Sequence, residues 1–181
     1  LDDIADRVQA AKRPMLWLGG GARDASAQAT ALAELGFGIV TSTQGRATVA
    51  EDHPGTLGAF NMTPEAADIY ASSDLMIVVG SRLRGNETKN NKWALPKPLF
   101  KMDAEPTQAG RNYPVDGFIC ADATLALQGL LDRLPDKLDT DPNFYHEIAI
   151  ARAKSEGALR ARLGPYQIVA DHLLARIPAG R

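Results

Sequence analysis

An apolar run that stops at three consecutive glycines constrains this chain more than any other stretch. Residues 14–18 read Pro-Met-Leu-Trp-Leu, Gly19, Gly20 and Gly21 follow, and an alanine-rich segment comes next. This order predicts a strand, a tight turn and the start of a helix. Because glycine has no Cβ, a ligand can approach such a turn closely, and the first N–H groups of a helix attract anions. The three glycines are therefore candidates for a nucleotide site.

Four further apolar runs predict strands, at residues 38–43, 75–79, 99–102 and 118–121. Segments with helical features separate most of them, at 4–11, 25–35, 64–72 and 123–134, and Asp3, Asp24 and Thr63 are the expected caps of the first three. Strands that alternate with helices indicate an α/β fold, a parallel sheet with helices on both faces. The connections 44–61 and 84–97 are long and polar, and long connections within a compact domain are often functional.

Polar and glycine residues follow the ends of the predicted strands. In parallel sheets, ligands gather at the carboxyl ends of the strands. The expected crevice is therefore lined by glycines, hydroxyl groups, one arginine that could hold a phosphate, and two carboxylates that are more typical of helix caps or ribose contacts than of an acid/base pair. These residues are Gly19–Gly21, Thr43, Gly80–Arg82, Asp103 and Asp122.

The glycine turn departs from the fingerprint of NAD-binding proteins. Asp24 stands where the third glycine is expected, and Thr41–Thr43 stand where the acidic residue is expected. A nicotinamide dehydrogenase is thus disfavoured. A turn that only packs a helix against the sheet is the alternative interpretation. His53, His146 and His172 are too far apart in the sequence to form a close-spaced metal motif.

The charge balance gives no indication of a nucleic-acid or anionic-membrane partner. Lys and Arg number 20 against 22 Asp and Glu, for a net charge of −2. No apolar run approaches the roughly 20 residues of a membrane span, so we expect a soluble, cytoplasmic protein. Cys120 is the only cysteine, which excludes a disulfide within the chain and a multi-cysteine zinc site. Since it lies in an apolar run, we expect a buried, inert thiol.

The last part of the chain differs in character from the first. Residues 136–164 read as a charged linker followed by a helix with little apolar face, and 165–181 begin another helix. In that helix Tyr166, Val169, Leu173 and Ile177 share an apolar stripe that nothing else in the chain covers. We expect it to open a further domain. Because the first residue is Leu1, we also expect the chain to be a segment of a longer protein.

Several short motifs follow one another in a distinctive order. They are Lys12-Arg13-Pro14, Leu18–Ala22, Glu51–Pro54, Leu57-Gly58, Ser73–Arg82, Met102–Pro106 and Ala121–Ala123. This series, over roughly residues 5–134, resembles the central domain of thiamine-diphosphate-dependent enzymes of the acetolactate synthase group. The segment from Gly164 onward is similar to the entry into the next domain of that family.

The resemblance implies a three-layer Rossmann-like fold of the DHS-like NAD/FAD-binding type for residues 1–135. It implies a parent enzyme, a lyase or transferase, that decarboxylates 2-oxoacids or joins their fragments. Thiamine diphosphate and Mg²⁺ would bind outside this segment, in the flanking domains of a homodimer or homotetramer. We therefore expect no catalytic residue and no metal ligand here. Asp116-Gly117 followed by Asn143 imitates the family's Mg²⁺ signature, but precedes a strand where the signature follows one, and is assigned to chance.

Some members of the family bind FAD in the central domain, and others bind ADP there or leave the crevice empty. Two positions depart from the flavin-binding pattern: Asn61 replaces the last glycine of Gly-Met-x-Gly, and Asn86 replaces an arginine. These departures weaken the match to flavin-binding members, so the resemblance leaves three alternatives for a real or vestigial crevice: FAD, ADP or no ligand. The positions that match cofactor contacts are Gly19, Gly20, Gly21, Thr43, Gly58, Gly80, Ser81, Arg82, Asp103, Asp122 and Ala123.

Two alternatives stay open from the sequence. The chain could be a free-standing nucleotide- or flavin-binding module, similar to electron-transfer flavoproteins or sirtuins, although Cys120 cannot supply the four zinc cysteines of a sirtuin. It could also be a purely structural domain that spaces its neighbours, since a fold does not determine a function.

Overall fold

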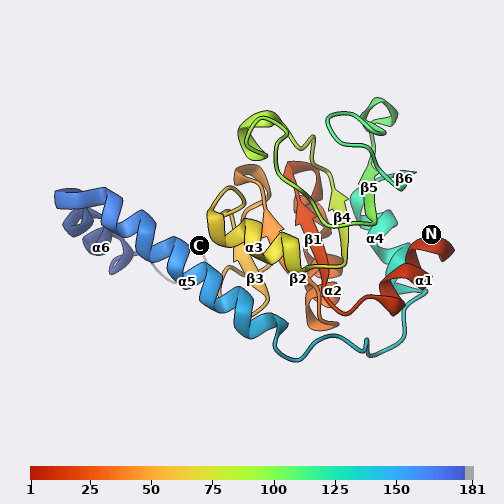
Figure 1. The fold of residues 1–181 in the computed structure, drawn as a ribbon, viewed down its shortest axis with the longest axis horizontal. Coiled ribbons are helices and arrows are strands. Elements are labelled where there is room, and N and C mark those ends of the chain that lie inside the picture. Colours follow the sequence, from red (N-terminus) through yellow and green to blue (C-terminus); the bar gives the residue numbers. More distant parts are fainter. Residues whose placement is uncertain (178–181) are drawn as a thin grey trace.

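The protein is an α/β structure built on one six-stranded parallel sheet (Figure 1). A computed structural model describes residues 1–177. The strand order is β3-β2-β1-β4-β5-β6, and every neighbouring pair is parallel. The strands are β1 (Pro14–Leu18), β2 (Gly38–Thr41), β3 (Thr56–Gly58), β4 (Leu75–Val79), β5 (Leu99–Asp103) and β6 (Gly117–Cys120), and the α-helices are α1 (Asp2–Ala10), α2 (Ser26–Glu34), α3 (Pro64–Ser72), α4 (Ala123–Leu131), α5 (Phe144–Leu163) and α6 (Gln167–Leu174). The predicted fold class is confirmed.

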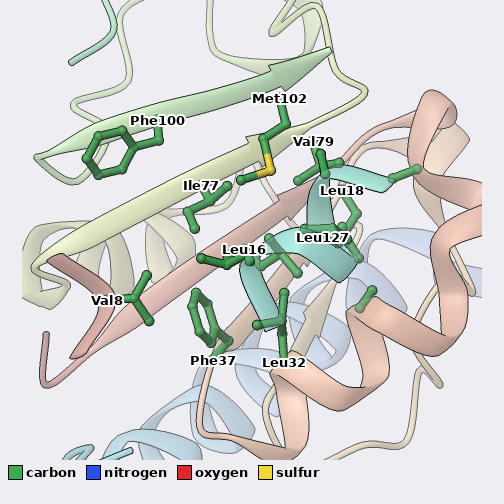
Figure 2. Close-up of a cluster of buried hydrophobic side chains, with 14 of the residues drawn as sticks. Val8, Leu16, Leu18, Leu32, Phe37, Ile77, Val79, Phe100, Met102 and Leu127 are labelled. Carbon is green, nitrogen blue, oxygen red and sulfur yellow. The ribbon is translucent and has the colours of Figure 1, made fainter. Parts of the chain in front are cut away.

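Both faces of the sheet are covered because its central strands are apolar on both sides. Along β1, Leu16 and Leu18 belong to one buried cluster, together with residues of α1, α2 and α4. Met15 and Trp17 point the other way, into a second cluster with residues of α3 and α5. Figure 2 shows the first cluster, in which Phe37 and Leu127 pack against the sheet. The continuous apolar runs seen in the sequence are thus those of strands buried on two faces.

Helix α5 contributes more to the core than its sequence suggests. Phe144, Ile148 and Ala151 are at most 6% exposed and close the second cluster over β2 and β3. Arg152, one residue further, donates from Nη1 to the carbonyl oxygens of Glu51, His53 and Thr56 at 2.8–3.0 Å. The expectation of a helix with little apolar face was wrong for its first half, because the buried residues are spaced by three or four and face the sheet.

The second half of α5 extends past the sheet, and α6 lies at its far end (Figure 1). Arg160 links the two helices through an ion pair with Asp171 at 2.7 Å. The apolar stripe predicted for the terminal helix lies on the surface, with Tyr166 72%, Val169 56% and Leu173 54% exposed. Within residues 1–177, no helix has the length and apolar character needed to cross a membrane.

Four local expectations were wrong. Asp3 and Asp24 are not caps: α1 begins at Asp2, and a 3₁₀ turn over Gly20–Ala25 delays the start of α2 until Ser26. The short strand β3 lies within the connection 44–61 and was missed because it has only three residues. Cys120 is exposed, since it ends the edge strand β6, where no further strand covers it.

Candidate functional site

The glycine turn after β1 rests directly on the turn after β4. The Gly19 amide donates to the Val79 carbonyl at 2.9 Å, and the Gly21 amide donates to the Gly80 carbonyl at 3.0 Å. A Cβ on Gly19 would come within 2.2 Å of the Gly80 oxygen, and Gly80 itself has a φ of +56°. Glycine is required here for backbone contact between two turns. The result is a floor made of main chain at the carboxyl edge of the sheet.

Two adjoining hollows lie on this floor. The first has a volume of about 180 Å³ and is bounded by the end of β2 and the segment after β4. The second has a volume of about 220 Å³ and lies toward β5 and β6. They share Gly21, Gly80 and Arg82. Each is smaller than the roughly 300–1,000 Å³ of a small-molecule site, but one ligand across both would reach the lower end of that range.

The two carboxylates of the second hollow also stabilise local backbone. Asp122 is the cap of α4, where Oδ1 accepts from the Thr124 amide at 2.9 Å and the Leu125 amide at 3.3 Å. Asp103 Oδ1 accepts from the Glu105 amide at 3.0 Å. In both residues the second oxygen, Oδ2, takes no part in these bonds and can accept a hydrogen bond from a ligand hydroxyl.

The segment after β4 forms the wall of the first hollow. Arg84 and Glu87 line it, and the Glu87 carboxylate accepts from the Arg84 amide at 3.3 Å in a capping arrangement. Asn112, from the loop after β5, donates to the Arg82 carbonyl at 2.7 Å. The Arg82 and Arg84 side chains are exposed and so can turn toward a bound anion.

Eight of the predicted contact positions line the hollows: Gly20, Gly21, Gly80, Ser81, Arg82, Asp103, Asp122 and Ala123. Gly19 lies beneath them in the floor, Thr43 is exposed, and Gly58 lies on β3; none of the three lines either hollow. Sequence reasoning missed six lining residues: Ser42, Gln44, Arg84, Glu87, Met102 and Ala104. Four of them adjoin a predicted position, and that adjacency was the available signal. Arg84 and Glu87 lie on either side of Asn86, which sequence reasoning noted only as a departure from the flavin-binding pattern, in a loop that reads as solvated.

A buried lysine lies on β5, next in sequence to Met102 and Asp103 of the second hollow. Lys101, on β5, is 1% exposed, and its Nζ donates to the Gln108 carbonyl at 3.0 Å. Burial lowers the pKa of Lys101, Asp103 opposes that shift, and Arg111 adds to it. The unfolded chain therefore binds the proton more tightly than the folded chain does.

We expect Lys101 to make stability depend on pH. Below the folded-state pKa both states carry the proton and the penalty for the buried charge is complete. As pH rises from the folded-state pKa toward the ordinary value of 10.5, the folded state loses the proton first and the penalty declines. The wild type should therefore gain stability relative to Lys101→Met over this interval. Urea unfolding of both proteins from about pH 8 to about pH 10 measures the difference, in which shared tyrosine titrations cancel. A difference that is constant with pH would contradict the prediction.

Nothing in the described residues resembles a metal centre. Across residues 1–177, no three His, Cys, Asp or Glu side chains come together as ligands. His53 Nδ1 accepts from the Gly55 amide at 3.1 Å. Asp116, from the chance match to a Mg²⁺ signature, accepts from the Leu99 amide at 2.7 Å, and this bond lowers the pKa of its carboxyl group. The residues present do not fit a Mg²⁺–thiamine diphosphate site.

A comparison with protein-family models shows which family has this architecture. Residues 1–130 match the model described as thiamine pyrophosphate enzyme, central domain. The chain belongs to this family. The resemblance inferred from the ordered motifs is therefore confirmed, and the crevice described above is a feature of a thiamine pyrophosphate enzyme central domain.

Relatives of this central domain are several times longer than the chain. A probable 2-ketoarginine decarboxylase from Pseudomonas aeruginosa is 30% identical over 176 residues, which are 97% of the chain and 32% of that relative. A probable acetolactate synthase large subunit from Methanococcus aeolicus is 30% identical over 140 residues, or 74% of the chain and 23% of the relative. An X-ray structure from Mycobacterium smegmatis, described as a thiamin diphosphate-dependent enzyme, superposes with a TM-score of 0.62 at 27% identity and covers 78% of this chain and 28% of that one. The chain thus spans a third or less of these proteins.

Proposed function

We propose that the chain is the central domain of an enzyme that uses thiamine diphosphate and Mg²⁺ to decarboxylate a 2-oxoacid or to join the product to an acceptor. The observation that carries this proposal is the family match over residues 1–130, together with relatives named as a decarboxylase and acetolactate synthases. The cofactor supplies the carbanion chemistry, and the catalytic groups belong to domains outside residues 1–177. The flanking domains of the same polypeptide are the proposed partners, residues 165–181 open the following one, and a cytoplasmic homodimer or homotetramer stays a prediction.

The intact polypeptide that contains this chain tests the proposal. Purified with thiamine diphosphate and Mg²⁺, it should release CO₂ from at least one compound in a panel of 2-oxoacids, and omission of the cofactor should abolish the release. A polypeptide that lacks both an upstream catalytic glutamate and a downstream Gly-Asp-Gly to Asn signature, or that leaves every 2-oxoacid unchanged, would refute it.

A second role is proposed for the crevice itself, which is binding of an adenine nucleotide. The glycine floor admits a diphosphate close to the backbone, Arg82 and Arg84 can neutralise its charge, and the free oxygens of Asp103 and Asp122 can accept ribose hydroxyls. Denaturing the purified chain should release ADP or FAD, and the apo chain should rebind it. A chain that releases nothing and rebinds neither would favour a purely structural spacer.

A further inference from the structure

The wall of the first hollow contacts a segment that lies far from it in the sequence, the turn after β3. Asn61, in the turn that follows β3, donates from Nδ2 to the Glu87 carbonyl oxygen at 2.7 Å. Asn61 is 6% exposed, and the Tyr70 hydroxyl of α3 donates to its carbonyl at 3.1 Å. The residue is therefore held from both sides: its side chain by the wall of the first hollow, and its backbone by α3.

Glu87, which receives this bond, is itself fixed in place. The Glu87 amide donates to the Arg84 carbonyl at 2.8 Å, and the fully buried Thr88 donates from Oγ1 to the same carbonyl at 2.9 Å. To open a passage past Glu87, a ligand would have to break the bond between Glu87 and Asn61 and leave a half-buried carbonyl without this donor. We therefore expect the contact to block a ligand at this point, and not to move aside for it.

The residues that line the two hollows agree with a block at the Asn61–Glu87 contact. Gln44 and Glu87 line the first hollow, whereas none of the described residues 56–63 lines either hollow. β3 lies beside β2 in the sheet, so the site could in principle extend over its end. Gly58, which sequence reasoning placed in the site, lies at the end of β3 and lines neither hollow.

We infer that Asn61 limits the length of the nucleotide that the crevice accepts. This inference rests on the proposed nucleotide role of the crevice. A ligand with its ribose at Asp103 and Asp122 and its diphosphate over Gly21 and Arg82 reaches the Asn61–Glu87 contact soon after the diphosphate. ADP fits within this span. A dinucleotide such as FAD carries a second, larger half that meets the contact, so the site discriminates by exclusion.

Equilibrium dialysis of the 181-residue chain with ADP and with FAD tests the inference. The wild type should bind ADP and should bind FAD at least about tenfold more weakly. Asn61→Gly removes the side chain of the Asn61–Glu87 contact and should raise FAD affinity by about tenfold while ADP affinity stays within about twofold. Asn143→Gly is the matched control, since Asn143 is an exposed asparagine that lines neither hollow, and it should change neither affinity.

Each outcome decides a separate question. Wild-type chain that binds FAD as tightly as ADP would overturn the length limit and leave the nucleotide role intact. Chain that binds neither would overturn the nucleotide role, and the length limit with it. Asn61→Ala is the second variant, because it removes the amide without loosening the turn. If both Asn61 variants retain ADP binding but gain no affinity for FAD, Asn61 does not block FAD.

Discussion

Gly19→Ala is expected to lower the free energy of unfolding by about 3 kcal/mol. The new Cβ would lie 2.2 Å from the Gly80 carbonyl oxygen and 2.6 Å from the Ser81 Cα, so a methyl group cannot enter unless the turns after β1 and β4 separate. Those turns are backbone and cannot rotate away as a side chain would. Because native domains are stable by only about 5–15 kcal/mol, a loss of this size is measurable by urea or thermal unfolding.

Gly157→Ala is the control for this substitution. Gly157 lies within α5, and a Cβ there would have no heavy atom within 4 Å. Alanine is the better helix former, so this variant should be more stable than wild type by up to about 1 kcal/mol. If Gly19→Ala unfolds at the same denaturant concentration as wild type, the close approach of the two turns is wrong.

Phe144→Ala is expected to cost about 3–5 kcal/mol, the range for truncating a buried aromatic residue. Phe144 is 1% exposed at the start of α5, and the Arg13 guanidinium lies 4.9 Å from the centre of its ring. The substitution leaves a cavity beneath the helix and removes the cation–π contact. Thermal or urea unfolding, followed by circular dichroism, measures the loss.

Ile150→Ala on the same helix is the control, because it distinguishes the loss of buried packing from a change in helix propensity. Ile150 is 42% exposed, and its truncation should change stability by about 0.5 kcal/mol or less. Equal effects of the two substitutions would mean that α5 does not cover the sheet.

A large difference between the two variants would also change where the central domain is taken to end. Residues 136–164, which sequence reasoning assigned to a linker and helix, would then include a helix that the central domain requires for its own core.

The sequence predicts the sheet well because its strands are apolar on both faces. β1 and β4 are unbroken runs of five buried residues, and a run of that kind that ends at a glycine turn has few other interpretations. The Thr63 cap is equally clear, since Thr63-Pro64 places an acceptor and a proline where a helix needs them; the Thr63 hydroxyl accepts from the Ala66 amide at 3.2 Å. β3 was missed because a strand of three residues is too short to give a sequence pattern of its own, and it forms only where β2 is available to pair with it.

The candidate site was predictable only in part, for a similar reason. Residues at strand ends were found because the parallel topology alone brings them to one edge. The wall formed by Arg84 and Glu87 depends on a 3₁₀ turn and on a hydrogen bond from Asn61, 26 residues earlier in the chain. Cys120 shows the converse error: its apolar neighbours indicate burial, but the strand that contains it is the last in the sheet. Sequence periodicity does not record which strand lies at an edge.

The uninterrupted course of α5 has a geometric consequence for α6. Its 20 residues span about 30 Å at 1.5 Å each, and successive residues are rotated by about 100°. The first half is fixed by its contacts with the sheet, so the number of residues in the exposed half sets the direction in which α6 points. Removing one residue there would turn α6 about the α5 axis by more than a quarter of a circle, whereas an exposed substitution would leave its bearing unchanged. In this part of the protein, the direction of α6 about the α5 axis depends more on the number of residues in α5 than on the identity of its exposed side chains.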